Sequence, residues 1–224
     1  VQLGLLMDAY GIYNAASYRM LMQGLAGGGG FDAAGMSPET MIKDVLTAED
    51  GKLLDILEKR YGVDRTIIIA IWGVESNYGT QPGDMNVIRS LATLAYYNTK
   101  ASFARQQLIT ALKILQRGDI SVEAMNGSWA GAMGHTQFIP TTYQAYAVDY
   151  DGDGKRNIWN DVPDALASTA SYLKHSNWQA GQTWGYEVTL PKGLNPKKYS
   201  ERTLKSVGEW QELGIKRVNG EAFP

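Results

Sequence analysis

Apolar positions recur at helical spacing through most of the chain. The first of them, from Leu3 to Tyr13, repeat at roughly the interval of one helical turn, which predicts a helix or helical pair within residues 3–25. Four consecutive glycines follow at 27–30. Because such a run does not sustain a helix, we expect a hinge there.

Signals that start helices divide the next part of the chain. Ser37-Pro38-Glu39 combines a capping hydroxyl, a first-turn proline and an acid near the positive helix end. Asp64 is a second capping residue and predicts a helix from Arg65 to about Asn77. The remaining helices are predicted at 47–60, 86–97 and 102–116, and after the first-turn prolines Pro140 and Pro163.

Strand-like patterning appears only after Trp178, at 186–190 and 215–218. The sequence therefore predicts a mainly α fold of the α+β class, with a small irregular or β C-terminal part. We expect an N-terminal helical segment with the glycine hinge (1–50), a helical core (51–178) and an extension packing on that core (179–224).

Composition narrows the function classes. The chain has 224 residues with a net charge of -2, which gives no electrostatic footprint for nucleic acid. It has no cysteine, which excludes disulfides, thiol catalysis and cysteine-ligated metal sites. Residues 1–26 are too polar to span a membrane and lack the basic start of a secretion signal, so we expect no transmembrane segment.

One carboxylate stands out against this background. Residues 67–79 read IIIAIWGVESNYG, an apolar helix that ends in polar residues around Glu75. Apolar surroundings raise the pKa of a carboxyl group, so that it can hold a proton near neutral pH and protonate a glycosidic oxygen. The alternative is a helix-end glutamate in solvent or in an ion pair.

Four blocks place Glu75 in a wider context. Glu75-Ser76-x-x-Gly79 resembles the start of the lysozyme-like transglycosylase fold, and GSWAGAMGHTQFIPTTYQAY at 127–146 resembles the second signature of the lytic transglycosylase B family. RSLATLAYY and DVPDALASTASYLKHSNW are also similar to that family. The resemblance covers roughly Leu53 to the C-terminus and implies a lysozyme-like helical catalytic domain.

The resemblance also implies roles for particular residues. Glu75 matches the single catalytic acid and base, and Tyr172 a tyrosine close to it. Lys100 falls where relatives carry an arginine pair near the muramyl groups. The positions that line the sugar groove are Ser128, Met133, Gln137 and Phe138.

The residue chemistry of that block leaves a second interpretation. Ser128 and Gln137 can hydrogen-bond N-acetyl and hydroxyl groups. Alternatively, the small residues of the block only permit tight packing. His135, also in this block, is more often a satisfied polar residue than a catalyst.

The activity that the resemblance implies is cleavage of peptidoglycan glycan strands by a lytic transglycosylase. The protein would then act in the periplasm or cell envelope. A hydrolytic muramidase, a catalytically silent wall-binding module and a calcium-dependent interaction domain are the alternatives.

An acidic loop at 149–160 predicts a cation site. Asp149, Asp151 and Asp153 occupy positions 1, 3 and 5 of an EF-hand-like loop, and Lys155 would offer its backbone carbonyl. Position 12 holds Asn160 instead of glutamate. The resemblance gives the closing ligand to Asp164, with Asp161 as competitor, so the metal loop spans 149–164. We expect structural Ca²⁺, with Na⁺ or an empty site as alternatives; no cofactor is needed for the chemistry.

Overall fold

The computed structural model describes residues 49–97, 101–181, 186–195, 198–199, 203 and 205–223. The helix predicted within 3–25, the glycine hinge and the helix start at Ser37 lie outside these residues. Within these residues the chain divides into two compact units, and the boundary falls between Ala180 and Gly181. The predicted three-part division stays a prediction.

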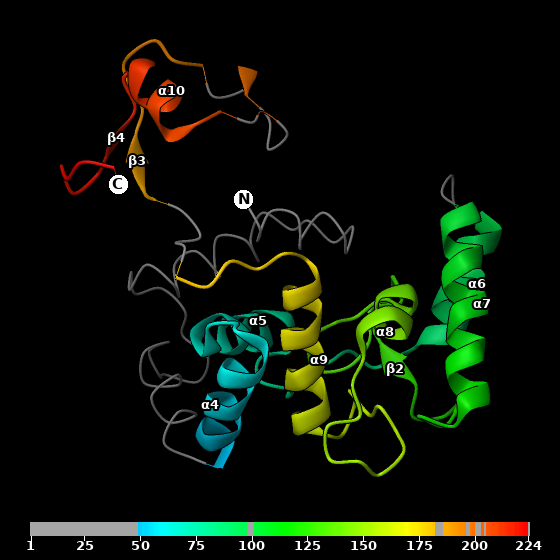
Figure 1. Ribbon diagram of the computed structural model, residues 1–224. Coiled ribbons are helices and arrows are strands. Elements are labelled where there is room, and N and C mark those ends of the chain that lie inside the picture. Colours follow the sequence, from blue (N-terminus) through cyan, green and yellow to red (C-terminus); the bar gives the residue numbers. More distant parts are fainter. Residues whose placement is uncertain are drawn as a thin grey trace. The chain divides into compact units, whose positions relative to one another are not determined.

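The described residues of the larger unit form six helices, which Figure 1 labels α4 to α9. Their bounds are α4 Glu49–Tyr61, α5 Arg65–Ser76, α6 Val87–Tyr97, α7 Ala101–Arg117, α8 Pro140–Tyr146 and α9 Val162–His175. These bounds confirm the helices predicted between 47 and 116 to within two residues. Pro140 and Pro163 lie in the first turns of α8 and α9, as predicted.

Helix α9 is the centre of this unit. Every residue from Asp164 to Leu173 is buried. The helix contacts α4, α5 and α8, while α8 contacts α7 and α7 packs along α6 as a hairpin (Figure 1). Leu54, Leu57 and Ile68 are fully buried in this core. The apolar stretch of α5 therefore ends inside the unit, where Glu75 projects.

Capping explains where α4 and α5 begin and end. Acids in the first turn of α4 and bases in its last turn complement the helix dipole. The Asp64 side chain accepts a hydrogen bond from Thr66 N at 2.8 Å and starts α5. Asn77, with φ 48°, takes the left-handed conformation that ends α5 directly after Glu75 and Ser76.

Two short strands in the larger unit were not predicted. Met85–Asn86 (β1) pairs antiparallel with Asn126–Gly127 (β2), with Asn86 opposite Asn126. Two-residue strands have no periodicity from which a sequence could predict them. Their pairing brings the segment that begins at Gly127 beside the chain that leaves α5.

The described residues of the second unit form the predicted strand pair and one further helix. Val188–Thr189 (β3) pairs antiparallel with Lys216–Arg217 (β4), inside the predicted ranges. Helix α10, Val207–Glu212, was missed. Its capping box is nevertheless readable in the sequence, because Ser206 and Glu209 bond each other's backbone N–H.

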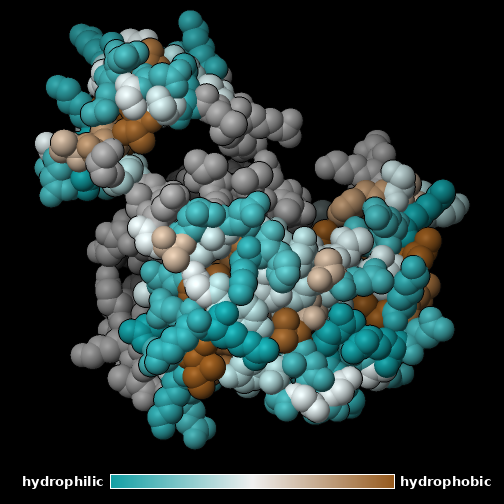
Figure 2. Space-filling model, viewed as in Figure 1, coloured by the Kyte–Doolittle hydropathy of each residue, from teal (hydrophilic) through white to brown (hydrophobic). Residues whose placement is uncertain are grey.

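The surface is mostly hydrophilic in the view of Figure 2, with hydrophobic residues showing over the α6–α7 hairpin. On α7, Ile109 and Leu112 are among the exposed large apolar side chains. Among the described residues, no helix combines the length and the apolar character needed to cross a bilayer.

Candidate active site

Glu75 lies on the last turn of α5, between the buried Trp72 and the buried Ser76. Its side chain is half-buried. Burial raises the pKa of the Glu75 carboxyl from 4.5 to about 7, and no described residue offsets this with a positive charge or a hydrogen bond. The group can therefore hold a proton near neutral pH, and the ion-pair alternative has no support among the described residues.

The helix end that carries Glu75 is fastened to the segment 127–139. Ser76 Oγ donates to the carbonyl oxygen of His135 at 2.5 Å and accepts from Gly79 N at 2.9 Å. Trp72 Nε1 donates to His135 Nδ1 at 2.9 Å. His135 is thus a buried polar residue with its hydrogen bonds satisfied, as its sequence context predicted. It bonds one residue before Glu75 on the helix, Trp72, and one after it, Ser76.

The segment 127–139 folds back on itself. Met133 exchanges two backbone hydrogen bonds with Phe138, each 2.9 Å long. Ser128 Oγ accepts from Ala132 N at 3.1 Å, so this hydroxyl oxygen also stabilises its own turn. Met133 is fully buried and Phe138 is 1% exposed. The side chains of Met133 and Phe138 therefore shape the segment from inside.

Gln137 has an unusual backbone conformation, and its side-chain amide is held by hydrogen bonds. Its backbone has φ 52°, and its side-chain Nε2 donates to Pro82 O at 2.8 Å and to Gly134 O at 2.9 Å. Both amide hydrogens are therefore used on backbone carbonyls. The side-chain carbonyl oxygen is the atom that Gln137 has left to accept a hydrogen bond from a sugar.

Tyr172 reaches the same region from α9. Its ring contacts Phe138 edge-on, with centroids 5.9 Å apart, and Tyr146 at 5.2 Å. Burial raises the pKa of the Tyr172 hydroxyl, so it is protonated at neutral pH. The structure thus brings Tyr172 together with Phe138, while Lys100 lies outside the described residues.

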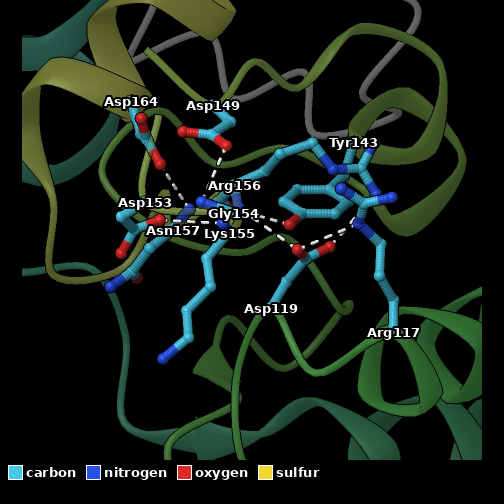
Figure 3. A network of polar contacts seen from close by, with 10 residues as sticks. All are labelled: Arg117, Asp119, Tyr143, Asp149, Asp153, Gly154, Lys155, Arg156, Asn157 and Asp164. Atoms are coloured by element: carbon cyan, nitrogen blue, oxygen red, sulfur yellow. Dashed lines mark hydrogen bonds and ion pairs between the residues drawn. The ribbon is translucent and has the colours of Figure 1, made fainter. Parts of the chain in front are cut away.

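The acidic loop has the layout expected of a cation site. One oxygen from each of Asp149, Asp151 and Asp153 lies within 4.8 Å of the other two. The carboxylates also accept backbone hydrogen bonds from within the loop: Gly154 N donates to Asp149 at 2.9 Å, and Lys155 N to Asp153 at 2.8 Å (Figure 3). These bonds hold three like charges together, an arrangement that a hard cation would stabilise.

Asp164 is not one of these three carboxylates. It is 1% exposed, and one of its oxygens accepts from Tyr150 N at 2.7 Å. The other accepts from Asn157 N at 2.6 Å (Figure 3). Burial raises its pKa to about 6, against the effect of these two donors. The Asp164 side chain therefore closes the loop by binding the loop's backbone N–H groups. Asp161, the alternative closing ligand, caps α9 by accepting from Asp164 N.

A second buried carboxylate, that of Asp119, binds the acidic loop at Arg156 and was not predicted from the sequence. Asp119 accepts from the Arg156 backbone N at 3.2 Å, from the Arg156 guanidinium at 3.1 Å and from Arg117 Nε at 3.1 Å (Figure 3). Burial by itself would raise the pKa of Asp119, but Tyr143, Arg117 and Arg156 outweigh it and hold the pKa below its ordinary value. No local pattern marks Asp119, because Arg156 is far along the chain.

Comparison with known proteins agrees with this geometry. The family described as Transglycosylase SLT domain matches residues 43–224. The chain belongs to this family. Its helical core is accordingly a transglycosylase SLT domain, and the predicted resemblance is confirmed.

Three relatives of this SLT domain give the scale of the similarity. Membrane-bound lytic murein transglycosylase B of Escherichia coli K12 is 38% identical over 154 residues, 66% of this chain and 42% of that protein. SltB3 from Pseudomonas aeruginosa, solved in complex with NAG-NAM-pentapeptide, is 55% identical with a TM-score of 0.72, over 80% of this chain and 48% of that one. Escherichia coli Slt35, solved in complex with calcium, is 29% identical with a TM-score of 0.73, over 95% and 64%. The chain thus spans less than half the length of the first two relatives.

Proposed function

We propose that this SLT domain is a lytic transglycosylase that cleaves the β-1,4 bond between MurNAc and GlcNAc in peptidoglycan. The observation that carries the proposal is Glu75, whose carboxyl has a pKa of about 7 at the end of a buried helix. A general acid works best when its pKa lies near the working pH. The similarity to SltB3, which binds a NAG-NAM-pentapeptide, supports peptidoglycan as the substrate.

The proposed reaction uses Glu75 twice. Its carboxyl first donates a proton to the glycosidic oxygen, and the bond from that oxygen to C1 of MurNAc breaks. The resulting carboxylate then accepts the proton of the MurNAc C6 hydroxyl, whose oxygen bonds to C1 and closes a 1,6-anhydro ring. The proton returns to Glu75 and no water is consumed. A single carboxyl group therefore suffices, whereas most glycosidases need two.

The remaining predicted residues take supporting roles in this proposal. The Gln137 side-chain carbonyl accepts from a sugar hydroxyl or amide hydrogen, since its two amide hydrogens are used elsewhere. Ser128 Oγ has a hydrogen to donate. Met133 and Phe138 fix the wall behind these groups, Tyr172 packs beside Phe138, and Lys100 contributes a positive charge toward the muramyl groups.

Purified peptidoglycan sacculi digested in ¹⁸O-labelled water separate the alternatives. A transglycosylase releases anhydromuropeptides, one water lighter than hydrolysis products and free of the label. A hydrolytic muramidase releases reducing-end products that carry the label. A silent wall-binding module pulls down with sacculi and releases nothing, and either of these last two results would overturn the proposal.

Matched variants assign the chemistry to Glu75. Glu75→Gln keeps the size of the side chain and should release no anhydromuropeptides, while Glu123→Gln, at an exposed position, should digest sacculi like the wild type. The wild-type rate should fall as the pH rises through about 7, since the acid loses its proton there. Full activity of Glu75→Gln would remove Glu75 from the mechanism.

We also propose that the acidic loop binds Ca²⁺ through Asp149, Asp151 and Asp153, with the Lys155 carbonyl as a further ligand. Asp164, whose oxygens accept from Tyr150 N and Asn157 N, would join through a remaining lone pair. The clustering of the three carboxylates supports this, as does the similarity to Slt35, whose structure holds calcium. Titration calorimetry should show binding that Asp151→Asn weakens and that Mg²⁺ or Na⁺ does not reproduce. Equal heats for Na⁺ and Ca²⁺ would count against a calcium site.

Since peptidoglycan is the proposed substrate, we assign the protein to the periplasm or cell envelope.

A further inference from the structure

His135 joins the helix end that carries Glu75 to the acidic loop. Its imidazole Nδ1 accepts from Trp72 Nε1 at 2.9 Å, and its carbonyl oxygen accepts from Ser76 Oγ at 2.5 Å. Its backbone N donates to Ile158 O at 3.0 Å, in the second half of the acidic loop. Trp72 is three residues before Glu75 and Ser76 is one residue after it, so both bonds hold the helical turn that carries the acid.

The imidazole is held in one protonation state. An indole N–H only donates, so Nδ1 of His135 must present its lone pair to Trp72. Burial lowers the pKa of His135 more than the Trp159 backbone and the Asp161 carboxylate raise it, so the ring is neutral at neutral pH. The proton of the neutral ring is then on Nε2.

The turn that follows Glu75 is fitted to the same ring. A Cβ added to Gly79 would lie 2.2 Å from Cε1 of His135, so the glycine leaves room for the imidazole. The same Gly79 donates its N–H to Ser76 Oγ. Ring, hydroxyl and turn therefore form one packed unit behind Glu75.

We propose that His135 is a positioning residue for Glu75: its imidazole, through Trp72, and its carbonyl, through Ser76, fix the helix end from which the acid reaches its substrate. The inference rests on the proposed function for the identity of the acid. It adds a residue that does no proton chemistry itself. It also connects the acidic loop, through Ile158, to the helix that carries Glu75.

The test compares two replacements of His135, only one of which leaves an acceptor for the Trp72 N–H. His135→Asn keeps an acceptor at the place of Nδ1, whereas His135→Phe keeps a flat ring and leaves the Trp72 N–H without a partner. We expect kcat of His135→Phe to fall about 10- to 100-fold, as misplaced catalytic groups cost, with KM within about twofold of the wild type. His135→Asn should recover most of the loss.

A second readout separates positioning from plain stability. With ¹³C-labelled glutamate, the Glu75 carboxyl is titrated by NMR in each folded variant. In His135→Phe its pKa should fall from about 7 toward 4.5, because water reaches a loosened helix end. Unchanged titration and unchanged kcat in His135→Phe would overturn the inference. If that variant does not fold, Trp72→Phe removes the same hydrogen bond from the donor side and must give the same two changes.

The two proposals fail differently. If Glu75→Gln remains active, the proposed function fails, while the Glu75 titration in the His135 variants still tests the positioning. If Glu75→Gln is inactive but the His135 variants match the wild type in kcat and titration, only the positioning fails.

Discussion

Replacing Glu75 by glutamine should make the protein more stable, and the gain should depend on pH. The folded protein holds the Glu75 carboxyl at a pKa of about 7, above the 4.5 of the group in an unfolded chain. Below pH 4.5 the carboxyl is protonated in both states, so it costs the fold nothing. As the pH rises from 4.5 to about 7, the unfolded state gains a stabilising ionisation that the folded state lacks, and stability falls.

The size of the loss follows from the two pKa values. Each unit of pKa corresponds to about 1.4 kcal/mol, so the difference between 4.5 and about 7 corresponds to about 3 kcal/mol. This is an upper bound, since the half-buried carboxylate keeps part of its contact with water. Glutamine has nearly the same shape and no charge to desolvate, so the variant escapes the penalty.

Urea unfolding at about pH 4 and about pH 8.5 measures the effect. Glu75→Gln and the wild type should have similar free energies of unfolding at the lower pH, while at the higher pH the variant should be more stable by about 2–3 kcal/mol. Asp164 also titrates in this range, but its contribution cancels in the comparison. Glu123→Gln, at an exposed position, should track the wild type at both pH values.

The result that refutes the reasoning is equal stability of Glu75→Gln and the wild type at both pH values. It would mean that the folded protein solvates the Glu75 carboxylate well. Glu75 would then have the ordinary acidity of a surface glutamate, and the physical argument for a general acid would be lost, whatever the similarity to other transglycosylases.

Three further predictions concern the acidic loop, Gly134 and Asp119. Chelating Ca²⁺ should lower the melting temperature by several degrees, because a ligand at about 100 times its Kd adds about 2.7 kcal/mol to stability; an unchanged melt would contradict the site. Gly134→Ala should destabilise by more than about 2 kcal/mol, because its Cβ would lie 2.5 Å from Ile158 O, whereas Gly62→Ala, with open space around it, should lose about 1 kcal/mol. Equal losses in urea unfolding would contradict the close approach. Asp119→Ala should lose about 3 kcal/mol near neutral pH by leaving the half-buried Arg156 guanidinium unpaired, and the loss should shrink in strong acid, where Asp119 is protonated in both states. Arg117→Gln, whose side chain is 52% exposed, should lose less than about 1 kcal/mol, so similar losses for the two variants would be the contrary result.

Local sequence rules predicted the helices because local chemistry decides them. Asp64 predicted the start of α5, and two prolines marked α8 and α9, because capping and proline geometry act within one turn. The Ser206–Glu209 capping box follows the same rule and would have predicted α10. The three clustered aspartates were likewise predicted from their spacing alone.

The contacts within the site were not accessible to such rules. Gln137 was predicted to bind sugar, yet both of its amide hydrogens go to backbone carbonyls, one of them from Pro82. Asp119 and Arg156 are 37 residues apart, and no sequence pattern near Asp119 identifies Arg156 as its partner. A side chain with several donors and acceptors has many partners available, and only the folded chain selects among them.

The bonds at His135 also set an order of events during biosynthesis. Trp72 and His135 are 63 residues apart, and Ser76 and His135 are 59 apart. A contact across a loop of this length costs more chain entropy than a turn of helix, because the cost of closing a loop grows with its length. A nascent chain can therefore form α5 early, but the His135 bonds that hold its end form only after residue 135 has left the ribosome. Until the core forms around α5, the Glu75 carboxyl lacks the burial that raises its pKa, so the proposed general acid depends on the finished core.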